Sequence, residues 1–286
     1  YYIENNVGRV KVKEFSLDAS SKEKTLLKYG YKNEHQLTDQ HYPLLAIDSS
    51  ESSLGIIYEE RDQLKLRVLH IATYEYIEHT FPESIQRIYA FSFYEPGILL
   101  MSASTDGFSD LYFYDLEGRQ ATRITNDYYN ESGLVKIPGK DKNLFWVVSN
   151  HESDKFKAVE YDSFPPLSPY RLFAFDAEQE WSEALTTNKD HDILDVFFAG
   201  EKVIFRSKFS NMAVPELRPL QEGKPGSEGV FIDLPFRLIT HGYRQQHYFY
   251  VYRNTQNQYL IEKILLDTVR FKTDKDRKST RLNSSH

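Results

Sequence analysis

The sequence contains no cysteine and no long apolar run. The lack of cysteine excludes disulfides and thiolate metal sites, but it selects no cellular compartment. No segment approaches the roughly 18 consecutive apolar residues that a membrane helix needs, so we expect no membrane-spanning segment in this sequence. Positive charge is in deficit as well, with a formal net charge of −7. This balance argues against a nucleic-acid partner, because such binding needs clustered Lys and Arg.

Helical periodicity is also scarce, while aromatic residues are abundant. The chain has 21 Tyr and 19 Phe, which favour strands over helices. Short alternating or wholly apolar runs follow one another, separated by polar turns, as expected of an all-β protein.

Both ends of the sequence suggest a fragment. The chain opens on Tyr1 rather than on Met. Residues 276–286 resemble a translated sequencing adapter, so we expect a non-native tail there and exclude it from the fold prediction.

A marker recurs along the rest of the chain: an apolar strand that ends in Asp, followed by a small turn and a polar strand. With its degenerate copies it repeats at intervals of about 45–60 residues, close to the period of a four-stranded propeller blade. The sequence therefore predicts an all-β fold, a β-propeller of four-stranded antiparallel blades with about six blades or partial blades over residues 1–275. The predicted segments are a partial blade at 1–31, blades at 40–83, 87–127, 131–190 and 191–240, and a partial blade at 241–275.

The blade at 87–127 is the clearest. Its strands are expected in the order of the chain, with the two middle strands buried on both faces and the last strand exposed. Turn residues separate them, including Pro96-Gly97 and Asp106-Gly107. In the next blade, residues 151–169 replace a short turn and contain three prolines, so we expect an inserted surface loop.

Within the blade at 87–127, the segment 102–127 resembles the repeat of TolB-type, WD-repeat-like propellers of the bacterial cell envelope. That repeat runs Ser-x-x-Asp-Gly-x-x-Asp-Leu-Tyr-x-x-Asp-x-x-Gly, with a terminal Thr. Its positions are held here by Ser104 (or Ser102), Asp106, Gly107, Asp110, Leu111, Tyr112, Asp115, Gly118, Ile124 and Thr125, and Asp176 marks the next, weaker copy. The resemblance implies structural roles for these residues, a location in the periplasm or outer cell envelope, and a protein or peptide partner. Such propellers also resemble the N-terminal domains of prolyl oligopeptidase-like serine peptidases.

Candidate catalytic groups have simpler structural interpretations. Ser102, Ser104 and Ser109 lie near acids, but the chain has no Gly-x-Ser-x-Gly elbow, so we interpret them as turn and strand-end hydroxyls. The sequence Asp190-His191-Asp192 could bind a divalent metal, but a solvated turn is the preferred interpretation. The remaining histidines lack metal-ligand spacing, and we expect neither a metal nor a cofactor.

Aromatic and charged residues on predicted loops are the candidate binding residues. Trp146 lies in an apolar strand and is interpreted as core, whereas Trp181 begins a polar strand where exposure is expected. The candidates on the blade loops and the insert are His151, Lys155, Tyr161, Phe164, Trp181, His191 and Asp192.

Three functions remain open at this point. The preferred hypothesis is a non-catalytic protein- or peptide-binding scaffold propeller. The alternative is the gating propeller of a prolyl oligopeptidase-like peptidase whose catalytic domain lies beyond this sequence. A third hypothesis is a propeller glycosidase or lyase, which would require several carboxylates to converge.

Overall fold

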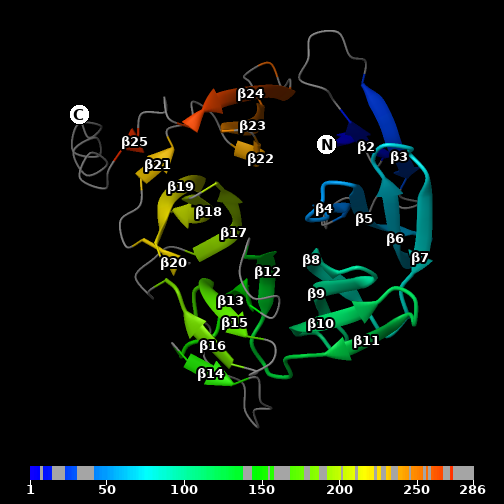
Figure 1. Cartoon of the computed structure of the whole chain (residues 1–286), viewed down its shortest axis with the longest axis horizontal. Helices are drawn as coiled ribbons and strands as arrows, with labels where there is room; N and C mark the ends of the chain where they lie inside the picture. The colour runs from blue at the N-terminus through cyan, green and yellow to red at the C-terminus, as the bar shows by residue number, and fades with distance from the viewer. Residues whose placement is uncertain are drawn as a thin grey trace. The chain divides into compact units, whose positions relative to one another are not determined.

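The structure is a computed structural model of the whole chain, and Figure 1 shows its strands in sequence order. It divides into two compact units, Tyr1–Arg123 and Ile124–His286. The residues that the structure describes are 1–6, 9–14, 23–30, 42–137, 144–153, 155–157, 168–176, 181–186, 192–200, 202–209, 212–221, 224–226, 230–232, 238–244, 246–253, 256, 259–266 and 271–272. The predicted tail at 276–286 lies outside them.

The first unit contains three antiparallel sheets in its described residues. Each strand pairs with its neighbour in the sequence, so each sheet is a meander. The strands are β1 (Tyr2–Asn6), β2 (Arg9–Glu14) and β3 (Lys24–Gly30) in one sheet; β4 (Leu44–Ile47), β5 (Ser53–Glu60), β6 (Gln63–His70) and β7 (Tyr76–Thr80) in the next; and β8 (Arg87–Glu95), β9 (Ile98–Ser104), β10 (Ser109–Asp115) and β11 (Gln120–Arg123) in the third.

The sheet β8–β11 has the strand order and burial that the sequence predicts. β9 and β10 are almost wholly buried, whereas β11 is mainly exposed or half-buried. Gly97 and Gly107 adopt positive φ values of 81° and 106° in the two turns that flank β9, a conformation that residues with a Cβ rarely adopt. The positions of the turn glycines and of the buried middle strands therefore agree with the prediction from the sequence pattern.

Apolar side chains fill the spaces between successive sheets of the first unit. One cluster joins β2 and β3 to β5, through residues such as Val10, Val12 and Ile56. A second cluster joins β5 and β6 to the sheet β8–β11, through residues such as Ile57 and Tyr114. The sheet β4–β7 is therefore covered on both faces, as a propeller blade between two others is.

Gly55 on β5 lies against the aromatic rings of Phe91 and Phe93 on β8. A Cβ at this position would lie 2.8 Å from Cε2 of Phe91 and 3.1 Å from Cζ of Phe93. We therefore expect Gly55→Ala to lower the free energy of unfolding by about 1–3 kcal/mol through overpacking, as measured by urea denaturation. Gly118→Ala is the control, because its Cβ would meet only the Asp115 side chain at an exposed turn, and a loss below about 0.5 kcal/mol is expected. Equal losses in both variants would contradict the packing explanation.

The second unit contains three further sheets in its described residues. Their strand orders are β12-β13-β15-β16-β14, then β17-β18-β19-β21-β25 with β20 beside β19, and finally β22-β23-β24. The bounds are β12 (Glu131–Lys136), β13 (Leu144–Ser149), β14 (Lys155–Lys157), β15 (Arg171–Asp176), β16 (Trp181–Ala184), β17 (Asp192–Ala199), β18 (Lys202–Phe209), β19 (Met212–Gln221), β20 (Lys224–Pro225), β21 (Val230–Ile232), β22 (Leu238–Arg244), β23 (His247–Arg253), β24 (Tyr259–Leu265) and β25 (Phe271–Lys272).

Two features of the second unit differ from a regular meander. Residues 155–157 of the predicted inserted loop form strand β14, which pairs antiparallel with β16 and extends that sheet to five strands. Strand β25 pairs with β21, although the sequence groups it with the segment 241–275. Trp146 is fully buried against Phe198, with ring centroids 4.7 Å apart, as its interpretation as core predicts.

Candidate binding surface

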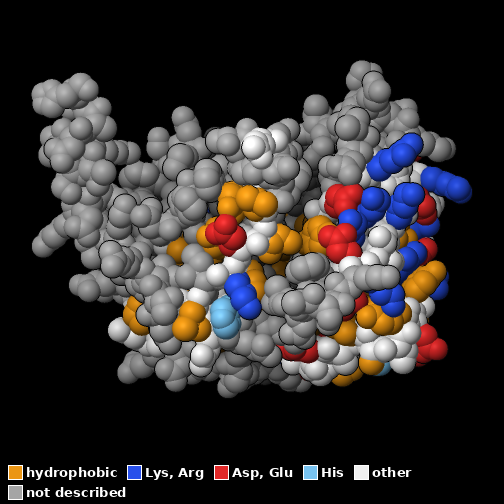
Figure 2. All heavy atoms as spheres, turned by 90° about the horizontal axis from the view of Figure 1, so that it is seen from above, with side chains coloured by type: hydrophobic (Ala, Val, Ile, Leu, Met, Phe, Trp, Pro, Cys, Tyr) orange, Lys and Arg blue, Asp and Glu red, His pale blue; other side chains and the backbone are white. Residues whose placement is uncertain are grey.

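The outer edge of the sheet β4–β7 carries the most exposed large hydrophobic side chains among the described residues. Strand β7 is the last strand in that sheet, and its residues Tyr76 and Ile77 are 54% and 66% exposed. Tyr74, in the preceding turn, is 36% exposed. We call these three residues the β7 surface. Figure 2 shows hydrophobic side chains at the molecular surface beside Lys, Arg, Asp and Glu side chains.

A short turn between β6 and β7 positions Tyr74. The backbone N–H of Tyr74 donates to the carbonyl of His70, and the N–H of His70 donates to the carbonyl of Glu75, both at 2.8 Å. Tyr74 itself has a φ of 63°, which is unusual for a residue with a side chain. Its hydroxyl donates to Glu14 on β2 at 2.7 Å, so the turn is held to the neighbouring sheet.

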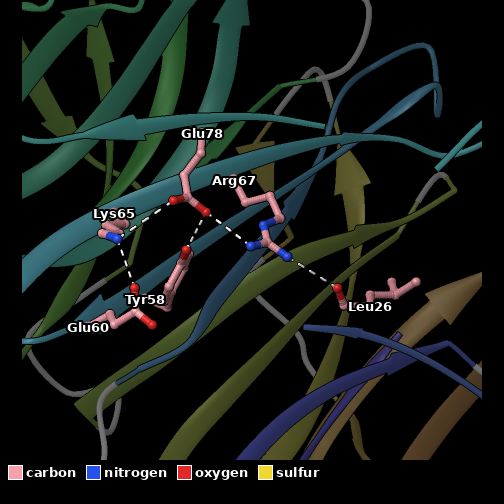
Figure 3. Close-up of polar contacts among 6 residues, drawn as sticks. All are labelled: Leu26, Tyr58, Glu60, Lys65, Arg67 and Glu78. Atoms are coloured by element: carbon pink, nitrogen blue, oxygen red, sulfur yellow. Dashed lines mark hydrogen bonds and ion pairs between the residues drawn. The ribbon is translucent and has the colours of Figure 1, made fainter. Parts of the chain in front are cut away.

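A network centred on Glu78 lies on the same face of the sheet as Tyr76, because side chains two residues apart on a strand share a face (Figure 3). The Tyr58 hydroxyl and Nη2 of Arg67 both donate to Oε2 of Glu78, at 2.5 and 3.0 Å. Lys65 lies 3.6 Å from Oε1 of Glu78 and donates to Glu60 at 2.8 Å. The network therefore ties side chains of β5, β6 and β7 together on one face of the sheet.

Arg67 connects this network to Tyr76 and to β3. Its Cζ atom lies 4.0 Å from the centroid of the Tyr76 ring, a cation–π distance. Its Nη1 donates to the carbonyl of Leu26 at 3.4 Å. The Tyr76 ring is thus held on one side by a guanidinium that is itself fixed. Because the ring is already ordered, binding a partner would cost less conformational entropy.

The protonation states in this network are set by burial and by hydrogen bonds. Burial opposes ionisation of the Glu78 carboxyl, but hydrogen bonds from Tyr58 and Arg67 outweigh it and hold its pKa below the usual value. Burial and the hydrogen bond to Glu78 raise the pKa of Tyr58. At neutral pH the carboxylate is therefore ionised and the phenol protonated, so this arrangement can position aromatic and apolar side chains but holds no group ready to exchange a proton.

The candidate binding residues predicted from the sequence lie on several segments of the second unit, and some of them fall outside the described residues. Asp192 begins β17, and its carboxylate accepts a hydrogen bond from the N–H of Tyr170 at 2.9 Å. Lys155 and Trp181 lie on the paired strands β14 and β16. Tyr161, Phe164 and His191 lie outside the described residues. The binding roles of these residues stay predictions.

His151 was expected on an exposed loop, but its side chain lies in the interior. It is 1% exposed and packs between the rings of Tyr129, with centroids 3.9 Å apart, and Phe173 at 6.4 Å. Its Nδ1 accepts a hydrogen bond from the N–H of Ser153 at 3.1 Å. Burial lowers its pKa to about 4, so the imidazole is neutral at neutral pH. The residue therefore packs inside the sheet edge rather than facing a ligand.

The repeat-signature residues have structural surroundings. Asp110 is fully buried and forms an ion pair with Nη2 of Arg123, whose Nη1 also lies 3.4 Å from Asp106. The hydroxyl of Tyr112 lies 3.2 Å from that of Thr105. The other signature residues are Ser104 and Thr125, which are buried, Asp176, which is half-buried, and Asp115 and Gly118, which are exposed.

The described part of the chain holds neither a clustered metal site nor a membrane-spanning helix. No group of three or more His, Cys, Asp or Glu side chains there is arranged to hold a metal ion. No helix there is long and apolar enough to span a membrane.

Neither a protein-family model nor a curated protein sequence matches this chain. Solved structures do match it. TolB from Acinetobacter baumannii superposes with a TM-score of 0.61 at 16% identity, over 93% of this chain and 59% of that one. A structure of a nidogen–laminin complex matches with a TM-score of 0.60 at 9% identity, over 94% of this chain and 90% of that one. Prolyl oligopeptidase B from Galerina marginata matches with a TM-score of 0.52 at 15% identity, over 81% of this chain and 33% of that one.

These comparisons establish the fold. The chain is an all-β protein whose antiparallel sheets, two of them four-stranded in the described residues, match β-propeller structures, and it is structurally similar to TolB and to the propeller of prolyl oligopeptidase. The sequence-based prediction of the fold class is confirmed. The chain spans 59% of the length of the TolB chain that it matches.

Proposed function

We propose that this chain is a non-catalytic propeller of the bacterial cell envelope that binds a protein or peptide partner, and that the β7 surface is its contact site. The observation that carries the proposal is the exposure of Tyr76 and Ile77 on the two faces of the edge strand β7, where Arg67 of the Glu78 network holds the Tyr76 ring. Rigid, exposed aromatic residues beside an arginine are typical of the residues that dominate binding energy at protein interfaces.

Two further observations support the proposal. The envelope location rests on the resemblance of residues 102–127 to the TolB-type repeat. The match to a structure of a nidogen–laminin complex relates the fold to a protein–protein assembly, though it says nothing of the partner of this chain.

Selection from a peptide-display library tests the proposal. The whole chain is immobilised, selected peptides are synthesised, and their Kd values are measured by fluorescence anisotropy. We expect Tyr76→Ser/Ile77→Ser to weaken binding at least about tenfold, because removing an interface anchor commonly costs more than about 1–2 kcal/mol.

The matched control is Leu260→Ser/Ile261→Ser, which removes two adjacent hydrophobic side chains of 37% and 42% exposure from β24. This variant should bind like the unsubstituted chain. If no peptide is enriched, or if the β7 variant binds as well as the control, the proposal is wrong.

The alternative function is the gating propeller of a prolyl oligopeptidase-like peptidase. The match to prolyl oligopeptidase B favours this alternative, because the match covers only 33% of that protein and this chain therefore corresponds to one part of it. Sequencing the gene beyond this segment separates the two functions. A downstream Gly-x-Ser-x-Gly elbow would support the peptidase, and its absence from the full gene would leave the binding function.

A further inference from the structure

The first sheet, β1–β3, has one apolar face and one basic face. Along β2 the side chains of Val10 and Val12 are fully buried in the cluster that joins this sheet to β5. Because side chains alternate along a strand, Arg9, Lys11 and Lys13 lie on the opposite face. The strand therefore presents three cations at every second residue, away from the core of the unit.

The strand register adds a fourth cation beside them. Lys28 of β3 lies directly opposite Lys11, and both Lys28 and Arg9 are exposed. Like charges directly opposite each other in a sheet destabilise the pairing. We call Arg9, Lys11, Lys13 and Lys28 the basic face; Figure 2 shows Lys and Arg side chains gathered on one part of the surface.

Carboxylates on this face balance only part of the positive charge. Glu4 on β1 accepts a hydrogen bond from Lys11 at 2.8 Å and also pairs with Lys13. Glu23 accepts from Lys13 at 2.9 Å. Among the described residues of this face, four cations thus meet two carboxylates, a local positive excess in a chain whose formal net charge is −7.

We propose that the basic face binds an extended acidic peptide segment with carboxylates at alternate residues. Alternate side chains of an extended peptide are about 6.5–7 Å apart, which is also the spacing of Arg9, Lys11 and Lys13 along β2. Such a segment would relieve the repulsion between Lys11 and Lys28. The inference rests on the proposed function, because it names the chemistry of a partner at a second face of the same unit.

The distribution of charge favours a peptide over a polyanion of uniform charge. Glu4 and Glu23 lie among the cations, and they would repel a phosphate backbone or an anionic membrane that covers the whole face. A peptide can place uncharged residues beside these carboxylates.

The test uses the whole chain and a fluorescein-labelled peptide of alternating Glu and Thr, with a Gln–Thr peptide as the uncharged probe. Fluorescence anisotropy at low salt should show saturable binding of the Glu peptide only. We expect Arg9→Gln/Lys28→Gln to weaken that binding at least about tenfold, and a rise to about 0.3 M salt to weaken it similarly through screening. Arg119→Gln/Lys263→Gln, which also removes one exposed Arg and one exposed Lys, should leave it unchanged.

Several results would overturn the inference: equal binding of the Gln peptide, equal effects of the two variants, or tighter binding of a single-stranded oligonucleotide or of anionic vesicles at equal charge. A second copy of the chain as the occupant, seen as salt-sensitive dimerisation lost in Arg9→Gln/Lys28→Gln, would also overturn it. If the Glu peptide fails while a display-selected peptide still depends on Tyr76 and Ile77, this inference is wrong and the proposed function stands.

Discussion

Replacement of Arg171 by methionine is expected to lower the free energy of unfolding by about 3 kcal/mol. Arg171 is 1% exposed, and its Nη2 donates to the carbonyls of His151, Glu152 and Ser153 at 2.8, 2.9 and 3.1 Å. Methionine fills a similar volume but donates no hydrogen bond. A buried carbonyl therefore loses its charged donor, at a cost of about 1–3 kcal/mol, and residues 151–153 lose the side chain that holds their backbone in place.

Urea denaturation followed by tryptophan fluorescence measures this loss. Lys224→Met is the control, since its side chain is 58% exposed and its ammonium pairs with Glu183 at 3.3 Å, and exposed pairs contribute little. If Arg171→Met and Lys224→Met unfold at the same urea midpoint, the three carbonyls are not held by the Arg171 side chain.

The stability of the chain is expected to fall by about 3 kcal/mol between pH 6.5 and pH 4 because of His151 alone. Burial lowers the pKa of His151 to about 4, whereas an unfolded histidine titrates near 6.5. Between these values the unfolded chain binds a proton that the folded chain does not. The contribution is therefore complete above pH 6.5 and is lost as the pH falls through this window.

His151→Asn isolates this contribution from the acid titration of carboxyl groups. The asparagine side chain has an oxygen that can accept the hydrogen bond from Ser153, but it does not titrate. The difference in unfolding free energy between the two proteins should shrink steadily from pH 7 to pH 4. His70→Asn, at an exposed position, is the matched control substitution. A pH-independent difference for His151→Asn would mean that the imidazole is not buried in the neutral form.

The sequence carried most of the information about the fold and less about the site. The strands at 98–104 and 109–115 were predictable because their apolar runs end at residues that tight turns need. The ion pair between Asp110 and Arg123 was not predictable. It depends on the register of β10 against β11, and many registers satisfy the same hydrophobic pattern.

The inserted segment shows why short elements escape prediction. Residues 155–157 form a strand that exists because the edge of β16 offers unpaired backbone groups, and three residues have no periodicity to detect. His151 lies two residues after the end of the apolar strand β13. A single sequence does not say whether such a residue turns inward, and here the aromatic rings of Tyr129 and Phe173 enclose it.

Tyr76 lies within the blade predicted at 40–83, but its sequence context did not identify it as part of a binding surface. The available signal was an aromatic and an aliphatic residue in succession, at positions 76 and 77. Its significance depends on exposure and on the Glu78 network, in which Tyr58, Arg67 and Glu78 come from three strands.

The central claim is that a partner contacts the β7 surface, and site-specific photo-cross-linking tests it most directly. A photoreactive phenylalanine analogue is placed at Tyr76 in one protein and at Leu260 in another, and each is irradiated with a display-selected peptide. Mass spectrometry should find the peptide joined to position 76 and not to position 260. Efficient cross-linking at position 260, with none at position 76, would contradict the claim.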